Sequence, residues 1–413
     1  MCHVIARCSW SNRLAATLLA VLACLSYTPL RGAEPEDTAA ADAAVTDTAT
    51  VAPSRQDNWP SFRHDIRQTG VASSDLPEKL ELLWKFKAGE MVTSTAAIVD
   101  GQVFVASLKG EVTCLDLKSG QPVWVYHSKK AAAPDDFLPG FKASPLVTET
   151  SVFLGDEDGV FHAIDRKTGK RQWVFQSNAE IISSATPYDD QVLFGSYDSN
   201  LYCLKASSGE QVWQFTTEDR VNCSPAISGH FTFVAGCDAH LRVIDILTGK
   251  QQTDIPLGTY LIASPAVAGD LLYVGTFESE VVALNWKKAE RVWTQKDPKR
   301  EFPYHSSAAI TDQVVVVGGQ DKRVHCLRRQ DGQELWTFTT RGKVNSSPVI
   351  VGDRVFVGSN DGNLYGLRLK DGTEFWRHTD GRPFSASPAV GNGCLVIGSE
   401  SSEGFVYCFG KKH

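Results

Sequence analysis

Short runs of β-branched and aromatic residues alternate with polar turns along most of the chain. In one stretch, SPVIV, DRVFVGS, GNLYGLRL and EFWRHT follow one another, with Gly-Asp or Asp-Gly pairs marking the turns. Runs of this length and composition are typical of β-strands joined by tight hairpins. The pattern therefore predicts four antiparallel strands in each unit.

The unit recurs with a period near 40 residues. A serine or threonine opens each copy, and these residues are Thr95, Ser144, Ser184, Ser224, Ser264, Ser307, Ser347 and Ser387. The residues 29 positions after the first seven are Trp124, Trp173, Trp213, Thr253, Trp293, Trp336 and Trp376. One small sheet cannot bury both of its faces, so the copies must stack, and a period near 40 predicts an all-β propeller.

The last copy shows how the ring closes. Twenty-nine positions beyond Ser387 would be position 416, but the chain ends at His413. The run ELLWKFKAG (Glu81–Gly89) carries Trp84 at the corresponding place, ahead of the first full copy. We therefore predict an eight-bladed propeller over residues 81–413, with four-stranded antiparallel blades, in which the N-terminal strand completes the last blade.

Residues 1–33 have the features of a secretory signal. Arg7 and Arg13 precede an uncharged run that extends from Leu14 to Leu30. Alternatively, Val21–Cys24 resembles an imperfect lipobox, so that a lipoprotein signal would end before Cys24 and leave a lipid anchor there. An uncleaved membrane anchor is a third interpretation, because the run just reaches the length that spans a bilayer. In each case the protein is predicted to be exported, with a periplasmic location.

Two further segments precede the propeller. Residues 34–58 are mostly Ala, Thr, Asp and Pro, and they predict a disordered tether because they offer little apolar surface to bury. Residues 59–80 mix aromatic, charged and glycine residues, and we predict an ordered lead-in packed on the propeller's rim. The net charge of −7, without a Lys/Arg block, argues against a nucleic-acid partner. A single closed ring predicts a monomer.

The repeats resemble those of the PQQ-like (quinoprotein-type) propeller family. AIDRKTGKRQW (Ala163–Trp173) matches the tryptophan-docking pattern A-x-D-x-x-T-G-x-x-x-W in full, and the other copies match it in part. The lead-in NWPSFRHDIRQTG resembles an opening found in many exported proteins of this superfamily. The resemblance covers residues 58–413 and implies the propeller fold, with Trp84, Trp124, Trp173, Trp213, Trp293, Trp336 and Trp376 as structural blade residues.

Two branches of the family imply different functions. The BamB-type branch consists of periplasmic scaffolds that help to assemble outer-membrane β-barrels. The other branch consists of dehydrogenases that hold pyrroloquinoline quinone (PQQ) over the propeller's centre, between a tryptophan floor and a disulfide between adjacent cysteines, with calcium and a catalytic aspartate. This chain has no adjacent cysteine pair and no long insertion, and fold analogy alone does not transfer an activity.

Residues just before each opening serine or threonine are expected to face one mouth of the central channel. Polar and basic side chains recur there, with aromatic residues between them, and a few donors on a concave opening are typical of a ligand site. The candidate ligand-binding residues are Lys142, Arg220, Asn222, His305, Lys343, Asn345 and Arg382. The alternative is that these side chains simply cap strand ends at a hydrated channel.

No catalytic residue and no metal ligand is predicted. His305 has no nucleophile or paired carboxylate beside it in a recognisable motif. Asp156, Asp198 and Asp361 lie where hairpins should turn, so backbone preference explains them without calcium. Cys223 and Cys237 lie on adjacent strands of one blade, and whether they form a disulfide depends on their distance.

These observations favour an exported, non-enzymatic scaffold that binds envelope proteins and needs no cofactor. The alternative function is that of a PQQ- and calcium-dependent alcohol or sugar dehydrogenase, or of a small-ligand sensor that binds at the channel mouth.

Overall fold

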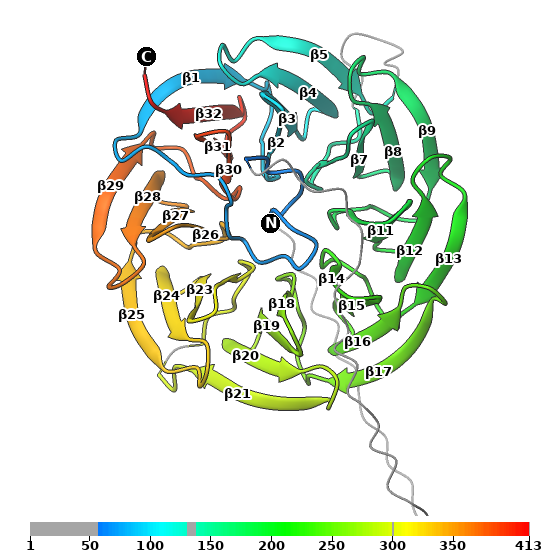
Figure 1. Cartoon of the computed structure of the whole chain (residues 1–413), viewed down its shortest axis with the longest axis vertical. Helices are drawn as coiled ribbons and strands as arrows, with labels where there is room; N and C mark the ends of the chain where they lie inside the picture. Colours follow the sequence, from blue (N-terminus) through cyan, green and yellow to red (C-terminus); the bar gives the residue numbers. More distant parts are fainter. Residues whose placement is uncertain (1–56, 130–137, 300, 413) are drawn as a thin grey trace, which may run out of the picture. The chain divides into compact units, whose positions relative to one another are not determined.

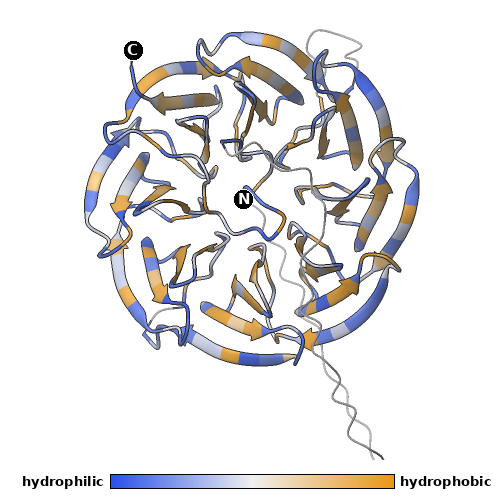
Figure 2. Ribbon diagram, viewed as in Figure 1, coloured by the Kyte–Doolittle hydropathy of each residue, from blue (hydrophilic) through white to orange (hydrophobic). Residues whose placement is uncertain are grey.

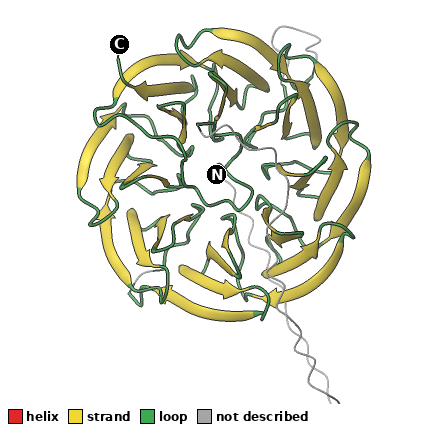
Figure 3. Ribbon diagram, viewed as in Figure 1, coloured by secondary structure: helices red, strands yellow, loops and turns green. Residues whose placement is uncertain are grey.

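The computed structural model describes residues 57–129, 138–299 and 301–412. These residues form eight four-stranded antiparallel sheets arranged around a central axis (Figure 1), and Figure 3 shows strands and loops only. The prediction of an all-β, eight-bladed propeller is confirmed. The predicted signal (residues 1–33) and most of the predicted tether lie outside the described residues. No helix that could cross a lipid bilayer occurs among the described residues.

Each blade runs from an inner strand beside the axis to an outer strand. Blades 1 and 2 are β2 (Ala97–Val99), β3 (Gln102–Ala106), β4 (Glu111–Asp116) and β5 (Pro122–His127), then β6 (Leu146–Val147), β7 (Ser151–Gly155), β8 (Val160–Asp165) and β9 (Arg171–Gln176). Blades 3 and 4 are β10 (Thr186–Tyr188), β11 (Gln191–Gly195), β12 (Asn200–Lys205) and β13 (Gln211–Thr216), then β14 (Ala226–Ser228), β15 (Phe231–Ala235), β16 (His240–Asp245) and β17 (Lys250–Pro256). Blades 5 and 6 are β18 (Ala266–Ala268), β19 (Leu271–Gly275), β20 (Glu280–Asn285) and β21 (Glu290–Lys296), then β22 (Ala309–Ile310), β23 (Val314–Gly318), β24 (Arg323–Arg328) and β25 (Glu334–Thr339). Blades 7 and 8 are β26 (Val349–Val351), β27 (Arg354–Gly358), β28 (Asn363–Arg368) and β29 (Glu374–Thr379), then β30 (Ala389–Gly391), β31 (Cys394–Gly398), β32 (Phe405–Gly410) and β1 (Glu81–Lys87).

The burial of each strand follows from its place in the blade. The second and third strands, such as β3 and β4, are buried on both faces because neighbouring blades cover them. The outer strands, such as β9 and β13, alternate between exposed and half-buried residues, and Figure 2 shows the same alternation of hydropathy around the ring. The core is therefore a ring of blade-to-blade interfaces.

The two ends of the propeller meet in blade 8. Strand β1 pairs antiparallel with β32, from Glu81 opposite Gly410 to Lys87 opposite Phe405, and Trp84 lies opposite Cys408. The sheet order is β1-β32-β31-β30, so the predicted closure is confirmed. Strand β32 therefore has a partner on both sides.

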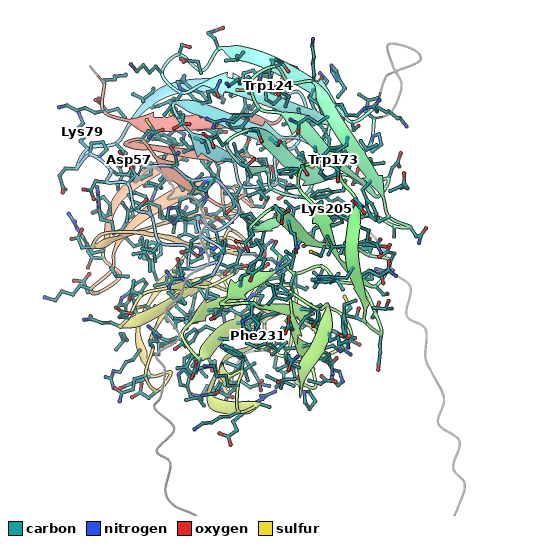
Figure 4. All side chains as sticks on the ribbon, turned by 45° about the vertical axis from the view of Figure 1, so that its right-hand side comes forward. Asp57, Lys79, Trp124, Trp173, Lys205 and Phe231 are labelled. Carbon is teal, nitrogen blue, oxygen red and sulfur yellow. The ribbon has the colours of Figure 1, made fainter. Side chains whose placement is uncertain are left out.

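The blade tryptophans join each blade to the next. Trp124 and Trp173 lie on the outer strands of successive blades (Figure 4). The Trp173 Nε1–H donates to the Ala206 carbonyl of blade 3 at 3.1 Å, and Gly209 of the same blade lies against the indole. The same hydrogen bond is made by Trp84, Trp124, Trp213, Trp293, Trp336 and Trp376.

The interface between blades 4 and 5 lacks both the docking tryptophan and the matching glycine. Thr253 stands where the tryptophan would be, and Ala289 stands where blade 5 would have the matching glycine. Trp286 of blade 5 fills the space instead: its ring centroid lies 5.3 Å from that of Phe233 in blade 4, and its Nε1–H donates to the Gly269 carbonyl at 3.0 Å. Blades 4 and 5 thus keep an aromatic contact, but the tryptophan now comes from blade 5 instead of blade 4.

Gly209→Ala is expected to lower the free energy of unfolding by about 3 kcal/mol, because it combines a collision with an unfavourable backbone angle. A Cβ at Gly209 would lie 2.5 Å from Cε3 of Trp173, and the φ angle is +74°. Gly229→Ala is the matched control, because its φ is also positive (+58°) but a Cβ there would meet nothing within 4 Å. We expect the control to cost about 1 kcal/mol. Chemical denaturation measures both values, and equal costs would contradict the tryptophan-docking role of this glycine.

The lead-in lies at the centre of the ring, not on its rim as predicted from sequence. It crosses the axis on the face where the inner strands end, which we call the bottom face (Figure 1). Its backbone hydrogen-bonds with residues of seven blades, and the partners are Ile98, Val147, Ile227, Val267, Ile310, Ile350 and Asn392. Asp57 and Asn58, which we assigned to the tether, already take part in these contacts. The inner strands lack a hydrogen-bonding neighbour on the side of the axis, and the lead-in supplies one.

Candidate functional site

The opposite face, where the inner strands begin, is called the top face. Its central mouth is built in the same way in all eight blades. Two residues of each blade are joined here by a backbone hydrogen bond of 2.8–3.2 Å. The donor N–H belongs to the second residue of the turn between the second and third strands. The acceptor carbonyl belongs to the residue four positions before the opening serine or threonine. In blade 5, for example, the Phe277 N–H donates to the Tyr260 carbonyl at 3.1 Å. Each blade therefore places three residues at the mouth: these two, and the residue two positions before the opening serine or threonine.

Two of the predicted cations at this mouth are paired with carboxylates. The Lys142 Nζ lies 2.8 Å from Oε1 of Glu157 and 3.1 Å from Oε1 of Glu180. Partial burial opposes the charged form of Lys142, but its hydrogen bonds with both glutamates outweigh burial and raise its pKa. Arg382 donates to Oδ2 of Asp380 at 2.8 Å. These two side chains are therefore already occupied by partners within the protein.

The other two cations are exposed and have fewer partners. The Arg220 guanidinium lies over the Tyr197 ring, 5.2 Å from its centroid, and Asn222 is placed near the Cys237 sulfur at 3.9 Å. Lys343 is exposed, and its carbonyl accepts a hydrogen bond from the Asn360 N–H. Arg220 and Lys343 belong to blades 4 and 7, so the structure does not bring them together.

Three polar residues form a small network between blades 6 and 7. The Gln320 side-chain amide nitrogen lies 2.8 Å from Nδ1 of His305 and donates to Oδ1 of Asn345 at 3.2 Å. Burial, reinforced by the positive charge of Lys343, lowers the pKa of His305, so its imidazole is neutral at pH 7. Among the described residues, no carboxylate or nucleophile is hydrogen-bonded to the His305 imidazole. The network therefore lacks the features of an acid–base pair.

Blade 5 makes the mouth strongly asymmetric. Its three mouth residues are all apolar and exposed: Tyr260 is 53% exposed, Ile262 37% and Phe277 44%. The Phe277 ring lies 6.1 Å from that of Tyr260 and 6.5 Å from that of His305. A group of exposed apolar side chains on a protein surface often marks an interaction site. We call Tyr260, Ile262 and Phe277 the blade-5 patch.

Sequence reasoning missed this patch because it selected polar and basic side chains at the mouth positions. Ile262 occupies, in blade 5, the position two residues before the opening serine, but it was passed over because it is apolar. Because the period is regular, the residues at the other two mouth positions can be aligned from blade to blade. In blade 5 that alignment gives Tyr260 and Phe277.

Deeper in the channel, hydrogen bonds link the opening threonine and serines of successive blades, and we call these residues the hydroxyl ring. The backbone N–H of each of the first seven members donates to the side-chain hydroxyl of the member in the next blade, at 2.8–3.0 Å. This bond runs through seven successive steps, from Thr95 to Ser387. The repeated serine seen in the sequence thus ties the inner strands of neighbouring blades together.

The predicted turn aspartates stabilise the turns within their own blades. Asp156, Asp198 and Asp361 accept hydrogen bonds from backbone N–H groups of their own turns. Within the part of the chain that the structure describes, no group of three or more His, Cys, Asp or Glu side chains could hold a metal ion. Cys223 and Cys237 are both free thiols.

The His325→Gln variant is expected to cost more stability at pH 5.5 than at pH 9. His325 on β24 is buried between Asp321 and Glu334, at 3.1 Å from each carboxylate. Burial alone would lower its pKa, but the two carboxylates raise the pKa above the usual 6.5. The folded state therefore holds the proton more tightly, so this contribution is present below pH 6.5 and is lost as the pH rises through the folded-state pKa.

Urea unfolding of both proteins at the two pH values measures this difference. Asp321 stays ionised at pH 5.5, because its hydrogen bond with His325 outweighs burial and lowers its pKa. The exposed His230→Gln serves as the control for the general pH dependence. A His325→Gln cost that is constant or larger at pH 9 would contradict the charged contact.

Comparison with known proteins places the chain in a family. The family model described as "Outer membrane protein assembly factor BamB" matches residues 77–198, 182–301 and 290–407, which together span the propeller. The chain belongs to this family. The match confirms the resemblance to PQQ-like repeat propellers.

Individual relatives come from both branches. The outer membrane protein assembly factor BamB of Xanthomonas campestris is 30% identical over 112 residues, which are 26% of this chain and 28% of that protein. The 1-butanol dehydrogenase (cytochrome c) of Thauera butanivorans is 34% identical over 107 residues, which are 24% of this chain and 15% of that protein. Among solved structures, BamB from Moraxella catarrhalis aligns with a TM-score of 0.67 at 20% identity, covering 81% of this chain and 98% of that one. The aligned parts of the two sequence relatives are less than a third of their lengths, and the structural likeness shows the fold alone.

The mouth does not fit the quinone and calcium ion of the dehydrogenase branch. The described residues contain no group of three or more His, Cys, Asp or Glu side chains that could bind a metal ion there. No described tryptophan offers a floor beneath the mouth: the blade tryptophans lie on outer strands, Trp59 lies in the lead-in, and Trp286 packs on Phe233. We therefore derive no quinone chemistry for this chain.

Proposed function

We propose that this protein is an exported, non-enzymatic scaffold that binds a protein partner at the cell envelope through its top face. The observation that carries the proposal is the blade-5 patch, where three apolar side chains stand exposed beside the mouth. Burying them against a partner would remove apolar surface from water, while Arg220 and Lys343 nearby would favour an acidic rim on that partner.

The two faces of the propeller support this assignment. The lead-in covers the axis on the bottom face, whereas on the top face the described residues of blade 5 leave large side chains in solvent. Membership of the BamB family agrees with a scaffold that works through protein contacts. The basic and apolar start of the chain supports export, with a lipid anchor at Cys24 as the alternative to cleavage near residue 33.

Co-purification with patch variants tests the proposal. A double Tyr260→Ser, Phe277→Ser variant is expected to lose a partner that the unaltered protein brings down from envelope extracts. Leu335→Ser is the control, because Leu335 is as exposed (45%) but lies on the outer strand β25. Retention of every partner by the double variant, with all variants folded by circular dichroism, would reject the patch as the binding surface.

The second candidate is a quinone-dependent dehydrogenase or a small-ligand sensor. It is favoured by the partial match to the butanol dehydrogenase and by Arg220 and Lys343, which have no carboxylate partner in the described part of the chain and could bind carboxylates. Titration with PQQ and calcium distinguishes the candidates, with tryptophan fluorescence and alcohol-dependent dye reduction as readouts. We expect no change in either. Saturable quenching without dye reduction would favour the sensor, and dye reduction would favour the enzyme.

A further inference from the structure

The bottom face has an open hollow beside the lead-in, at the junction of blades 5 and 6. Its volume is about 450 Å³, within the size range of small-molecule sites. One wall is formed by residues 64–73 of the lead-in, and the other by the ends of the inner strands β18 and β22 with the turn that follows β22. Val267 and Ile310 of these strands donate their N–H groups to carbonyls of the lead-in, each at 2.9 Å. Backbone hydrogen bonds thus fix the two walls relative to each other.

The floor of the hollow is apolar. Val71, Ala72 and Ala268 line it with partly exposed side chains, and the buried Val267 and Ile310 also border it. Small residues such as these offer only a modest apolar surface, so a bound molecule would gain only part of its affinity from them. Polar contacts must supply the rest.

Arg67 brings an unused guanidinium to the lead-in side of the hollow. Its side chain is exposed, and the guanidinium has no hydrogen-bond or ion-pair partner among the described residues. The carboxylate of Asp65, which also lines the hollow, is occupied by donors of the lead-in itself. These donors are the Arg67 N–H and the N–H and hydroxyl of Thr69. The Arg67 guanidinium therefore keeps its five N–H donors for a ligand.

Arg329 brings a second guanidinium from blade 6. Its Nε donates to the Tyr273 hydroxyl at 2.8 Å and its Nη1 to the Thr311 carbonyl at 3.2 Å, so the group is held in place. Its Nη2 has no hydrogen-bond partner among the described residues, but it is not one of their buried unpaired atoms, so it reaches the surface. The Asp312 carboxylate that lies 3.1 Å from Nη1 is fully exposed. Because an exposed ion pair contributes little, a ligand can compete with Asp312.

We propose that this hollow binds a small carboxylic acid with a short apolar chain, whose carboxylate is held by Arg67 and by the Nη2 of Arg329. Guanidinium groups match the planar carboxylate and form charge-assisted hydrogen bonds with it. The apolar chain would cover Val71 and Ala268 and so remove apolar surface from water. Such a ligand would join the lead-in to blade 6. The site lies on the face opposite the blade-5 patch, so it is independent of the partner proposed for the top face.

Hexanoate provides the direct probe, and hexanamide is its uncharged control of the same length. Saturation-transfer NMR with the full chain is expected to show hexanoate binding, with hexanamide bound at least tenfold more weakly because it cannot form charged hydrogen bonds. Crystals grown with 6-bromohexanoate should show an anomalous bromine peak in the hollow, beside Val71 and Ala268. Equal binding of the two probes, or a bromine peak only elsewhere on the protein, would overturn the proposal.

Matched arginine variants locate the binding in solution. Arg67→Gln and Arg341→Gln each remove an exposed guanidinium without a partner among the described residues, but only Arg67 lines the hollow. We expect hexanoate to bind about tenfold more weakly to Arg67→Gln, and with unchanged affinity to Arg341→Gln. Circular dichroism checks that both variants fold. Unchanged binding to Arg67→Gln, or a loss seen only in Arg220→Gln at the top mouth, would contradict the proposal and leave the partner-binding face untouched.

Discussion

A chain that begins at residue 88 is expected to lose cooperative folding, whereas a chain that begins at residue 57 should unfold like the full-length protein. The first form lacks β1, which pairs with β32 from Glu81 to Lys87 and whose Trp84 donates to the Leu117 carbonyl at 2.7 Å. Each ladder hydrogen bond contributes about 1 kcal/mol, and the loss comes together with the apolar contacts of β1. It also exposes β32 as an edge that can pair with other chains.

A form that begins at residue 78 separates the closing strand from the lead-in. It keeps β1 but lacks the backbone contacts of the lead-in with the inner strands. We expect it to fold, with a lower melting temperature than the form that begins at residue 57. Circular dichroism melting and light scattering compare the three forms. A residue-88 form that melts as sharply and at the same temperature as the residue-78 form would show that closure by β1 is dispensable.

Trp286→Ala is expected to lower the free energy of unfolding by about 3–5 kcal/mol, the range for removing a large buried aromatic residue. Trp286 is the residue that fills the blade 4–5 interface where Thr253 has replaced the docking tryptophan. Its indole also packs 5.4 Å from the Phe231 ring. Its loss leaves Phe233 without an aromatic neighbour across the interface, and Thr253 is too small to close the gap.

Chemical denaturation measures this effect, and Phe302→Ala provides the control. Phe302 is 47% exposed in the loop before blade 6, so its removal should change stability little. A cost for Trp286→Ala that is no larger than that of Phe302→Ala would mean that this interface is held by other contacts.

The architecture could be predicted from the sequence because the repeat encodes it many times over. The period and the tryptophan spacing predicted a propeller, and the missing last strand, with Trp84 at the corresponding place, predicted eight blades and closure by the N-terminal strand. The exchange in blade 4 was also readable, since Thr253 and Ala289 depart from the pattern together and Trp286 lies three residues before Ala289.

The lead-in and the mouth were harder to predict because their contacts carry no periodic signal. Backbone hydrogen bonds to seven blades hold the lead-in, and such bonds leave no residue preference in the inner strands. The rim prediction failed for this reason. Lys142 and Arg382 appeared to be free donors because the acidic residues that pair with them, Glu157, Glu180 and Asp380, were not considered as their partners.

Photo-crosslinking from position 277 in intact cells tests the central claim most directly, namely that the top face of the propeller binds a protein. A photoreactive phenylalanine analogue replaces Phe277 in one strain and Leu335 in another, so that an equally exposed site on the outer strand β25 serves as the reference. We expect a discrete protein adduct from position 277 and none from position 335. The absence of any adduct at position 277, or the same adducts from both positions, would contradict the claim.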